Sequence, residues 1–288
     1  PAAPRCRPYL LMNDETDAVA DAYAHTEPTL NSSVASATAA FALSKGLSMR
    51  EIEAASGVSA LDVVNPAARL PDDSVARLWR SLSEKRPGGT LPLEMARAAP
   101  FTFFGGLAHG AQFAETLRDA LEMMVRYRAV VSDRLQVEVA LDGDDAAILC
   151  DHPSSVIDGG LAKQCCVALI ARLISETLGV ADAVARIDFA SAPAGPIAHY
   201  REFFRTEVRF KQTQTALVLS PDRLDAPVSQ RNLELFGFVE RHFSGVVRRL
   251  ERTGYPAALA ALQGAVARNA AIGEFGSAQA AARAGLSL

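Results

Sequence analysis

The spacing of apolar residues changes in the middle of this chain, and that change constrains the fold strongly. Between residues 135 and 141 every second residue is a large apolar one, and another apolar run follows at 147–150, after Asp142-Gly143-Asp144-Asp145. A period of two sends alternate side chains to opposite faces of a strand, and Asp-Gly favours a tight turn between paired strands. The sequence therefore predicts an antiparallel strand pair with one face in the core and the other in water.

Helical spacing dominates on both sides of this pair. Before it, apolar residues recur every three or four positions, which predicts helices over about 31–46, 48–57, 72–85, 92–98 and 112–130. After it, the pattern predicts a long helix over 154–179, a strand at 185–189, a short helix at 199–204 and a second hairpin at 207–210 and 215–219. We predict an α+β fold, with N-terminal helices followed by an antiparallel sheet in the order ββαβαββ, covered by the long helix.

Composition limits the class of protein. The 288 residues are 49% hydrophobic and 22% charged, which is typical of one large or two modest globular domains. No run of about 18 apolar residues occurs, and Tyr9–Met12 is too short for a signal-peptide core, so we expect a cytoplasmic protein without a membrane span. The net charge of −4 argues against a nucleic-acid-binding surface over the whole chain.

The four cysteines form neither a CxxC pair nor a disulfide framework: Cys6, Cys150, Cys165 and Cys166. This indicates a reducing compartment. We interpret the adjacent Cys165 and Cys166 as two small core residues rather than a redox switch, because neighbouring side chains on a helix diverge by roughly 100°. On a strand, Cys150 and His152 point to one side, which is a weak hint of zinc, but no metal site is predicted.

The last fifteen residues have the pattern of a short helix followed by a tight turn. Ser277 suits a helix N-cap, an alanine-rich turn follows, and Gly285 suits the left-handed position that ends a helix. The spacing from Ala281 to Gly285, with Ser287 as the next cap, fits the first half of a helix-turn-helix. An alanine-rich terminal helix is the alternative for this motif by itself. The sequence stops at Leu288, where a recognition helix would begin.

Several segments in order carry a family resemblance. They are "NPAARLPDDSVARLW", "FFGGLAHGAQFAETLRDALEMMVRY" leading into "SDRLQVEVALDGDDAAI", "HYREFFRTEVRFKQTQTALVLSPDRLDAPV" and the final "AQAAARAGLSL". Together they resemble AraC/XylS-type bacterial transcription regulators with an arabinose-binding-type effector domain, like that of ornithine-utilisation regulators. The resemblance implies a ligand-responsive homodimer whose full-length form binds promoter DNA, with Ser277, Arg283 and Ser287 on the DNA side.

These observations divide the chain into four parts. We expect a flexible arm at 1–30, an effector-binding domain at 31–228, a linker or dimerisation helix at 229–253 and the incomplete start of a DNA-binding domain at 254–288. In the helix after residue 229, apolar residues step by three and four along one stripe: Phe236, Val239, Phe243, Val246 and Leu250. Such a stripe fits a dimer seam and packing on the same domain equally well.

The candidate ligand-binding residues come from an unusual apolar patch and two later positions. Phe101–Gly110 contains three phenylalanines, three glycines and a histidine, which fits either a tight core crossing or the wall of a pocket. Arg172 lies on an otherwise apolar helix and either reaches solvent or holds an anion. The predicted ligand-binding residues are therefore Phe103, Phe104, His109, Tyr127 and Arg172. They favour an apolar effector with one carboxylate over a sugar.

Motifs of common enzymes are missing from the sequence. It contains no GxSxG, P-loop, GxGxxG, HExxH or DxDxDG pattern, and its five histidines lie on separate segments. We predict no catalytic residue and no cofactor. An enzyme with a scattered active site and a purely structural dimerisation module remain the two alternatives.

Overall fold

The fold is described from a computed structural model of the chain. It describes residues 27–65, 68–100, 106–142, 145–253, 265–266, 269 and 276–283. Within those ranges no helix has the length and apolarity that a membrane crossing requires.

The N-terminal part is a layer of helices joined by a short strand pair. Its elements are β1 (Thr29–Asn31), α2 (Ser32–Ser44), α3 (Met49–Ser56), α4 (Ala60–Val64), β2 (Arg69–Pro71) and α5 (Ser74–Lys85), with β1 antiparallel to β2. The helix predicted over 48–57 is confirmed, and it opens with a capping box: the Ser48 hydroxyl accepts from the Glu51 N–H, while the Glu51 carboxylate accepts from the Ser48 N–H. Thr29 and Leu30 were expected in the arm but lie buried in β1.

Three helices and a 3₁₀ turn lead from this layer to the sheet. They are α6 (Leu91–Ala98), α7 (Leu107–Ala111), α8 (Leu117–Arg126) and η3 (Arg128–Val130). The helix predicted over 112–130 is therefore shorter than expected. Thr116 opens α8 as its N-cap, with its hydroxyl bound to the Asp119 N–H and the Asp119 carboxylate bound to the Thr116 N–H. This local cap competes with helix continuation and starts α8 at Leu117.

Five strands form one sheet in the order β3-β4-β7-β5-β6. They are β3 (Gln136–Asp142), β4 (Asp145–Asp151), β5 (Val184–Phe189), β6 (Glu207–Phe210) and β7 (Ala216–Leu219). The hairpin predicted from the alternating pattern is confirmed, with Val139 opposite Ile148 in the antiparallel β3–β4 pair. The α+β class and the ββαβαββ order along the chain are confirmed as well.

The second predicted hairpin is wrong. Strand β6 pairs with β5 in parallel, and β7 lies between β4 and β5. Parallel neighbours need a crossover connection, and α11 (Ile197–Phe204) supplies it. Aromatic packing holds this unit together, since the Phe210 ring lies 5.2 Å from that of Phe189 and 5.0 Å from that of Tyr200.

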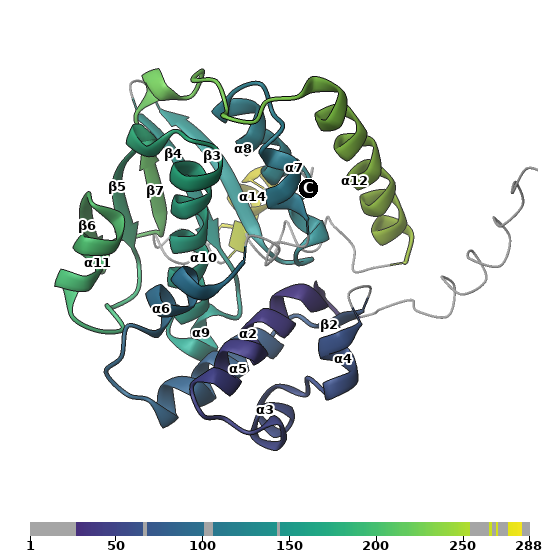
Figure 1. Cartoon of the computed structure of the whole chain (residues 1–288), viewed down its shortest axis with the longest axis vertical. Coiled ribbons are helices and arrows are strands. Elements are labelled where there is room, and N and C mark those ends of the chain that lie inside the picture. The colour runs from purple at the N-terminus through teal and green to yellow at the C-terminus, as the bar shows by residue number, and fades with distance from the viewer. Residues whose placement is uncertain are drawn as a thin grey trace, which may run out of the picture.

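The long helix predicted over 154–179 is broken near its start. It consists of α9 (Ser155–Asp158), α10 (Leu161–Arg172) and the π turn η4 (Leu173–Thr177). Gly159 and Gly160 separate α9 from α10 with φ of +65° and +88°, a conformation that glycine adopts without strain. Helix α10 lies over one face of the sheet (Figure 1), and α9 contacts α5 of the N-terminal layer.

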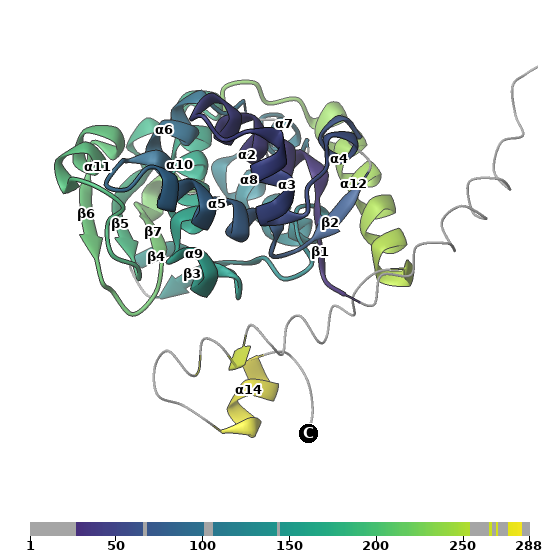
Figure 2. The same ribbon diagram turned by 90° about the horizontal axis from the view of Figure 1, so that it is seen from below.

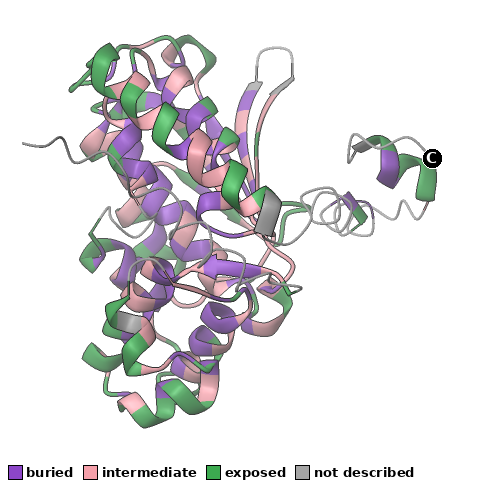
Figure 3. Cartoon of the chain, turned by 90° about the vertical axis from the view of Figure 1, so that its right-hand side faces the viewer, coloured by how far each residue is buried: buried purple, intermediate pink, exposed green. Residues whose placement is uncertain are grey.

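Helix α12 (Leu233–Thr253) lies on the far side of the molecule from α11 and β6 (Figures 1 and 2). The stripe found in its sequence packs on its own domain. Phe243 is 5% exposed, its ring is 5.8 Å from that of Tyr127, and Phe236, Val239 and Val246 are partly buried against the same core. Buried residues thus line the inner faces of the helices as well as the sheet (Figure 3).

Candidate functional site

A cavity of about 90 Å³ lies where the N-terminal layer meets the end of β4 and the start of α10. Its apolar wall comes from β1, α2, α5 and the segment before β3: Leu30, Val34, Val75, Trp79, Val131 and Leu135. Trp79 is the only tryptophan of the chain and is 1% exposed. Its side chain is part of the core and also forms part of this wall.

The polar lining of the cavity comes mainly from the end of β4 and from α10. It includes Ser132, His152, Ser154, Ser155 and Lys163, together with the thiols of Cys150 and Cys166. Cys150 and His152 both face the cavity, so the strand geometry inferred from their spacing is confirmed. The Lys163 side chain is 12% exposed, and its Nζ lies 2.6 Å from Asp151 Oδ1. The cavity therefore combines an apolar wall with a single side chain that carries a permanent positive charge.

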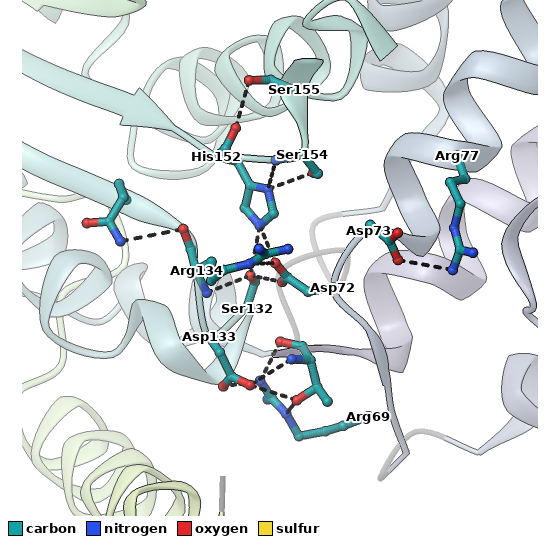
Figure 4. A network of polar contacts seen from close by, with 12 residues as sticks. Arg69, Asp72, Asp73, Arg77, Ser132, Asp133, Arg134, His152, Ser154 and Ser155 are labelled. Carbon is teal, nitrogen blue, oxygen red and sulfur yellow. Dashed lines mark hydrogen bonds and ion pairs between the residues drawn. The ribbon is translucent and has the colours of Figure 1, made fainter. Parts of the chain in front are cut away.

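The buried carboxylate of Asp72 organises the residues beside this cavity (Figure 4). Its Oδ2 lies 2.8 Å from Arg134 Nε and 3.0 Å from His152 Nε2, and its Oδ1 accepts from the Ser132 hydroxyl. Burial alone would raise the pKa of Asp72, but the hydrogen bonds from His152, Ser132 and Arg134 outweigh it and lower the pKa. Asp72 is therefore a charged link between the start of α5 and the β3–β4 hairpin.

Hydrogen bonds fix the tautomer of His152. The backbone N–H and the hydroxyl of Ser154 lie 3.2 and 2.7 Å from His152 Nδ1. A backbone N–H can only donate, so Nδ1 must accept and the ring is neutral with its proton on Nε2. That proton points to Asp72 and to Ser132 Oγ, which is 3.1 Å away.

This geometry bears on the enzyme alternative. A hydrolytic Ser-His-Asp triad needs one histidine nitrogen to accept from the serine and the other to donate to the aspartate. Here the same Nε2 faces both Ser132 and Asp72, while the Ser132 hydroxyl donates a hydrogen bond to Asp72. His152 therefore does not link Ser132 to Asp72 as the histidine of a triad would, and these three side chains do not form the geometry of a hydrolytic triad.

A second buried ion pair lies next to the first (Figure 4). Arg69 donates to Asp133 Oδ1 at 2.8 Å and to the Thr29 hydroxyl at 2.7 Å, and the Thr29 N–H donates to Asp133 Oδ2 at 2.8 Å. The side chains of Arg69 and Asp133 are only 11% and 6% exposed. Consecutive residues Asp133 and Arg134 thus bind β1–β2 and α5 to the segment that enters β3.

The structure places three of the five residues predicted to bind ligand away from this cavity. His109 is exposed on α7, while Tyr127 is buried with its hydroxyl 2.9 Å from Ser244 Oγ. Arg172 binds Glu176 at 2.7 Å and the carbonyl oxygens of Ala96 and Ala99, which ties α10 to the end of α6. None of these three residues lines the cavity beside Asp72, and Phe103 and Phe104 fall outside the described residues. Their role in ligand binding stays a prediction.

The predicted DNA-side residues belong to the C-terminal end. Helix α14 (Ser277–Arg283) begins at Ser277, whose side chain is exposed. The Arg283 side chain and Ser287 fall outside what the structure describes. Across the described part of the chain, no group of three or more His, Cys, Asp and Glu side chains is placed to hold a metal ion.

Sequence reasoning missed this site because its residues are far apart in the chain. Asp72 stands at the start of the helix predicted over 72–85, and nothing local links it to Ser132 or His152, which lie 60 and 80 positions later. The usable signals were the i,i+2 pair of Cys150 and His152 and the pair of neighbouring opposite charges at Asp133 and Arg134.

Comparison with known proteins identifies the family. Residues 46–228 match the model of the arabinose-binding domain of AraC transcription regulators, N-terminal, which is more than half of the chain. No curated protein matches. The crystal structure of the transcriptional regulator CdpR from Pseudomonas aeruginosa is similar with a TM-score of 0.46 and 16% identity, covering 83% of this chain and 75% of that one. On the family match, the chain belongs to the AraC transcription regulators that carry the arabinose-binding-type N-terminal domain.

Proposed function

We propose that the cavity beside Asp72 binds the effector of this ligand-responsive transcription regulator. The observation that carries the proposal is the position of the cavity, which is lined by the N-terminal layer, β4 and α10 together. A molecule that fills it contacts all three, so its binding energy can favour one arrangement of these elements over another. The ion pairs of Asp72 and Asp133 lie at the same junction and would respond to such a shift.

The lining favours a mainly apolar effector with one carboxylate. Trp79, Leu30 and Val75 offer apolar area, and Lys163 supplies an ammonium group with three donors, of which Asp151 takes one. A sugar would need several polar groups matched to its hydroxyls. The proposed ligand class is therefore the same as the one expected from the sequence. We propose that Lys163 binds its carboxylate, in place of His109 and Arg172.

We also propose that the full-length regulator binds promoter DNA as a homodimer in the cytoplasm and has no catalytic activity. Ser277, Arg283 and Ser287 would contact phosphates beside the major groove, and the second helix of such a motif would contact the base edges. Because the inner stripe of α12 packs on its own domain, we assign the dimer contact to the outer face, where Leu233, Leu235 and Phe238 are exposed.

Thermal-shift measurements with the full chain test the effector site. A series of linear carboxylates and the matching alcohols is compared, since a ligand at 100 times its dissociation constant stabilises the fold by about 2.7 kcal/mol. Carboxylates are expected to raise the melting temperature of the wild type, and Lys163→Met is expected to reduce that rise to the level of the alcohols. His109→Ala and Arg172→Ala serve as controls at the positions indicated by the sequence. If His109→Ala removes the shift while Lys163→Met keeps it, the cavity beside Asp72 is not the effector site.

A further inference from the structure

Two thiols from different elements face each other in the cavity wall. Cys150 lies on β4 and Cys166 on α10, and their Sγ atoms are 3.9 Å apart. Both residues line the cavity, and Cys166 is partly exposed to it. Cys165, the sequence neighbour of Cys166, is buried at 1% exposure and does not line the cavity. The thiol pair thus forms across elements and not between the adjacent cysteines.

The surroundings make the two thiols unequal. The hydrogen-bond contact with Cys166 and the nearby Lys163 charge lower the pKa of Cys150, despite its burial. The same contact and burial raise the pKa of Cys166 well above its ordinary value. Cys150 is therefore the thiol that reaches the thiolate form first, and the thiolate is the nucleophile in thiol chemistry.

We propose that Cys150 and Cys166 are an oxidation site at which a hydroperoxide entering the cavity is converted into a reversible Cys150–Cys166 disulfide. The Cys150 thiolate attacks the outer peroxide oxygen, the O–O bond breaks, and alkoxide or hydroxide leaves and takes up a proton. This step gives a sulfenic acid on Cys150. The Cys166 sulfur then attacks the Cys150 sulfur, the S–O bond breaks, and water leaves with the Cys166 proton. Overall the two thiols lose two electrons and the peroxide gains them.

The geometry requires only a local movement. A disulfide has a sulfur–sulfur distance of about 2.05 Å, so the Sγ atoms must approach from 3.9 Å. Cys166 is one helical turn from Lys163, and Cys150 is two residues from His152, so closure would also change the polar lining of the cavity. The disulfide itself is argued from the thiol geometry alone, while its effect on effector binding rests on the proposed function.

Peptide mapping of the full chain after graded hydrogen peroxide tests the site. The chain carries Cys6→Ser to remove the fourth thiol of the sequence, is quenched by alkylation and is digested without reductant. We expect one linked peptide pair, Cys150 with Cys166, which disappears with dithiothreitol. Cys165→Ser is the matched control and should give the same linkage, whereas Cys166→Ser should stop at a Cys150 sulfenic acid that dimedone traps. Circular dichroism checks that each variant is folded, and the mapping of the parent chain needs no buried substitution.

Three results would overturn the proposal. The first is no Cys150–Cys166 linkage at a peroxide dose that oxidises the thiols of the denatured chain. The second is a linkage that involves Cys165 instead, and the third is a linkage that appears only after unfolding. Effector affinity of the oxidised and reduced chains is then compared. An unchanged affinity refutes the coupling to the effector, whereas binding of carboxylates outside the cavity refutes the proposed function and leaves the oxidation site standing.

Discussion

The domain has two junctions of opposite character. At the Asp72 junction, the N-terminal layer meets the sheet through two buried ion pairs and a cavity. At the Phe243 junction, α12 meets α7 and η3 through close apolar packing, and a Cβ added to Gly110 would overlap the Val239 side chain. Close packing leaves little room for alternative arrangements. A polar junction around a cavity can be stabilised by a ligand, which is why we propose the first junction as the effector site and the second as its fixed support.

The largest expected effect is at the apolar junction. Phe243→Ala should lower the free energy of unfolding by about 3–5 kcal/mol, because it removes a buried ring packed on Tyr127 and leaves a cavity. Urea denaturation followed by circular dichroism measures this. Arg248→Ala, at an exposed position of the same helix outside the proposed dimer contact, should change the value by no more than about 0.5 kcal/mol. Equal effects of the two substitutions would show that the stripe is not intramolecular core.

Removing a charge from the polar junction should lower the free energy of unfolding more than removing a charge from a surface ion pair. Asp72→Asn should lower the free energy of unfolding by about 2–3 kcal/mol. Arg134 then lacks its charged partner, and a neutral amide replaces the carboxylate in the buried cluster. Asp73→Asn is the matched control. Its carboxylate pairs with Arg77 near the surface, and such pairs contribute about 0–1 kcal/mol. A negligible loss in Asp72→Asn, measured in the same urea series, would contradict a structural role for the cluster.

Acid should weaken the polar junction specifically. The folded-state pKa of Asp72 is lowered, so its contribution is fully present above the unfolded value of about 4 and is lost as the pH falls through the folded pKa. The stability difference between wild type and Asp72→Asn should therefore shrink below about pH 4. Burial raises the pKa of Asp158, so the difference between wild type and Asp158→Asn should change with the opposite sign. Urea midpoints at a series of pH values check both trends.

Local patterns predicted much of the fold. The alternation at 135–141, the capping box at Ser48 and the stop at Gly57 depend on neighbours in sequence, and each appears in the structure. The helix predicted as continuous over 154–179 is interrupted at Gly159 and Gly160, because the apolar spacing that predicts it does not report the left-handed conformation of these glycines. The strand with which β6 pairs could not be predicted from neighbouring residues. It depends on α11, which carries the chain back so that β6 lies parallel to β5.

The site was predicted less well than the fold, and the reason is physical. A cavity wall consists of side chains brought together by tertiary packing, so Trp79, Ser132 and Lys163 show no mutual spacing. A lone cation on an apolar helix, such as Arg172, was a plausible ligand group, but the structure uses it to bind Glu176 and carbonyl oxygens at the end of α6. The proposed chemistry of the effector was inferred from residue types, whereas the cavity proposed to bind it was found only in the structure.

Fluorescence of Trp79 is the most direct test of the sensing junction, because this sole tryptophan lies in the cavity wall. We predict that the carboxylate giving the largest thermal shift changes Trp79 emission saturably, with the same midpoint as the thermal shift. Lys163→Met should raise that midpoint by about tenfold, which corresponds to about 1.4 kcal/mol. A thermal shift without any change in Trp79 emission, or an unchanged midpoint in Lys163→Met, would contradict effector binding in this cavity.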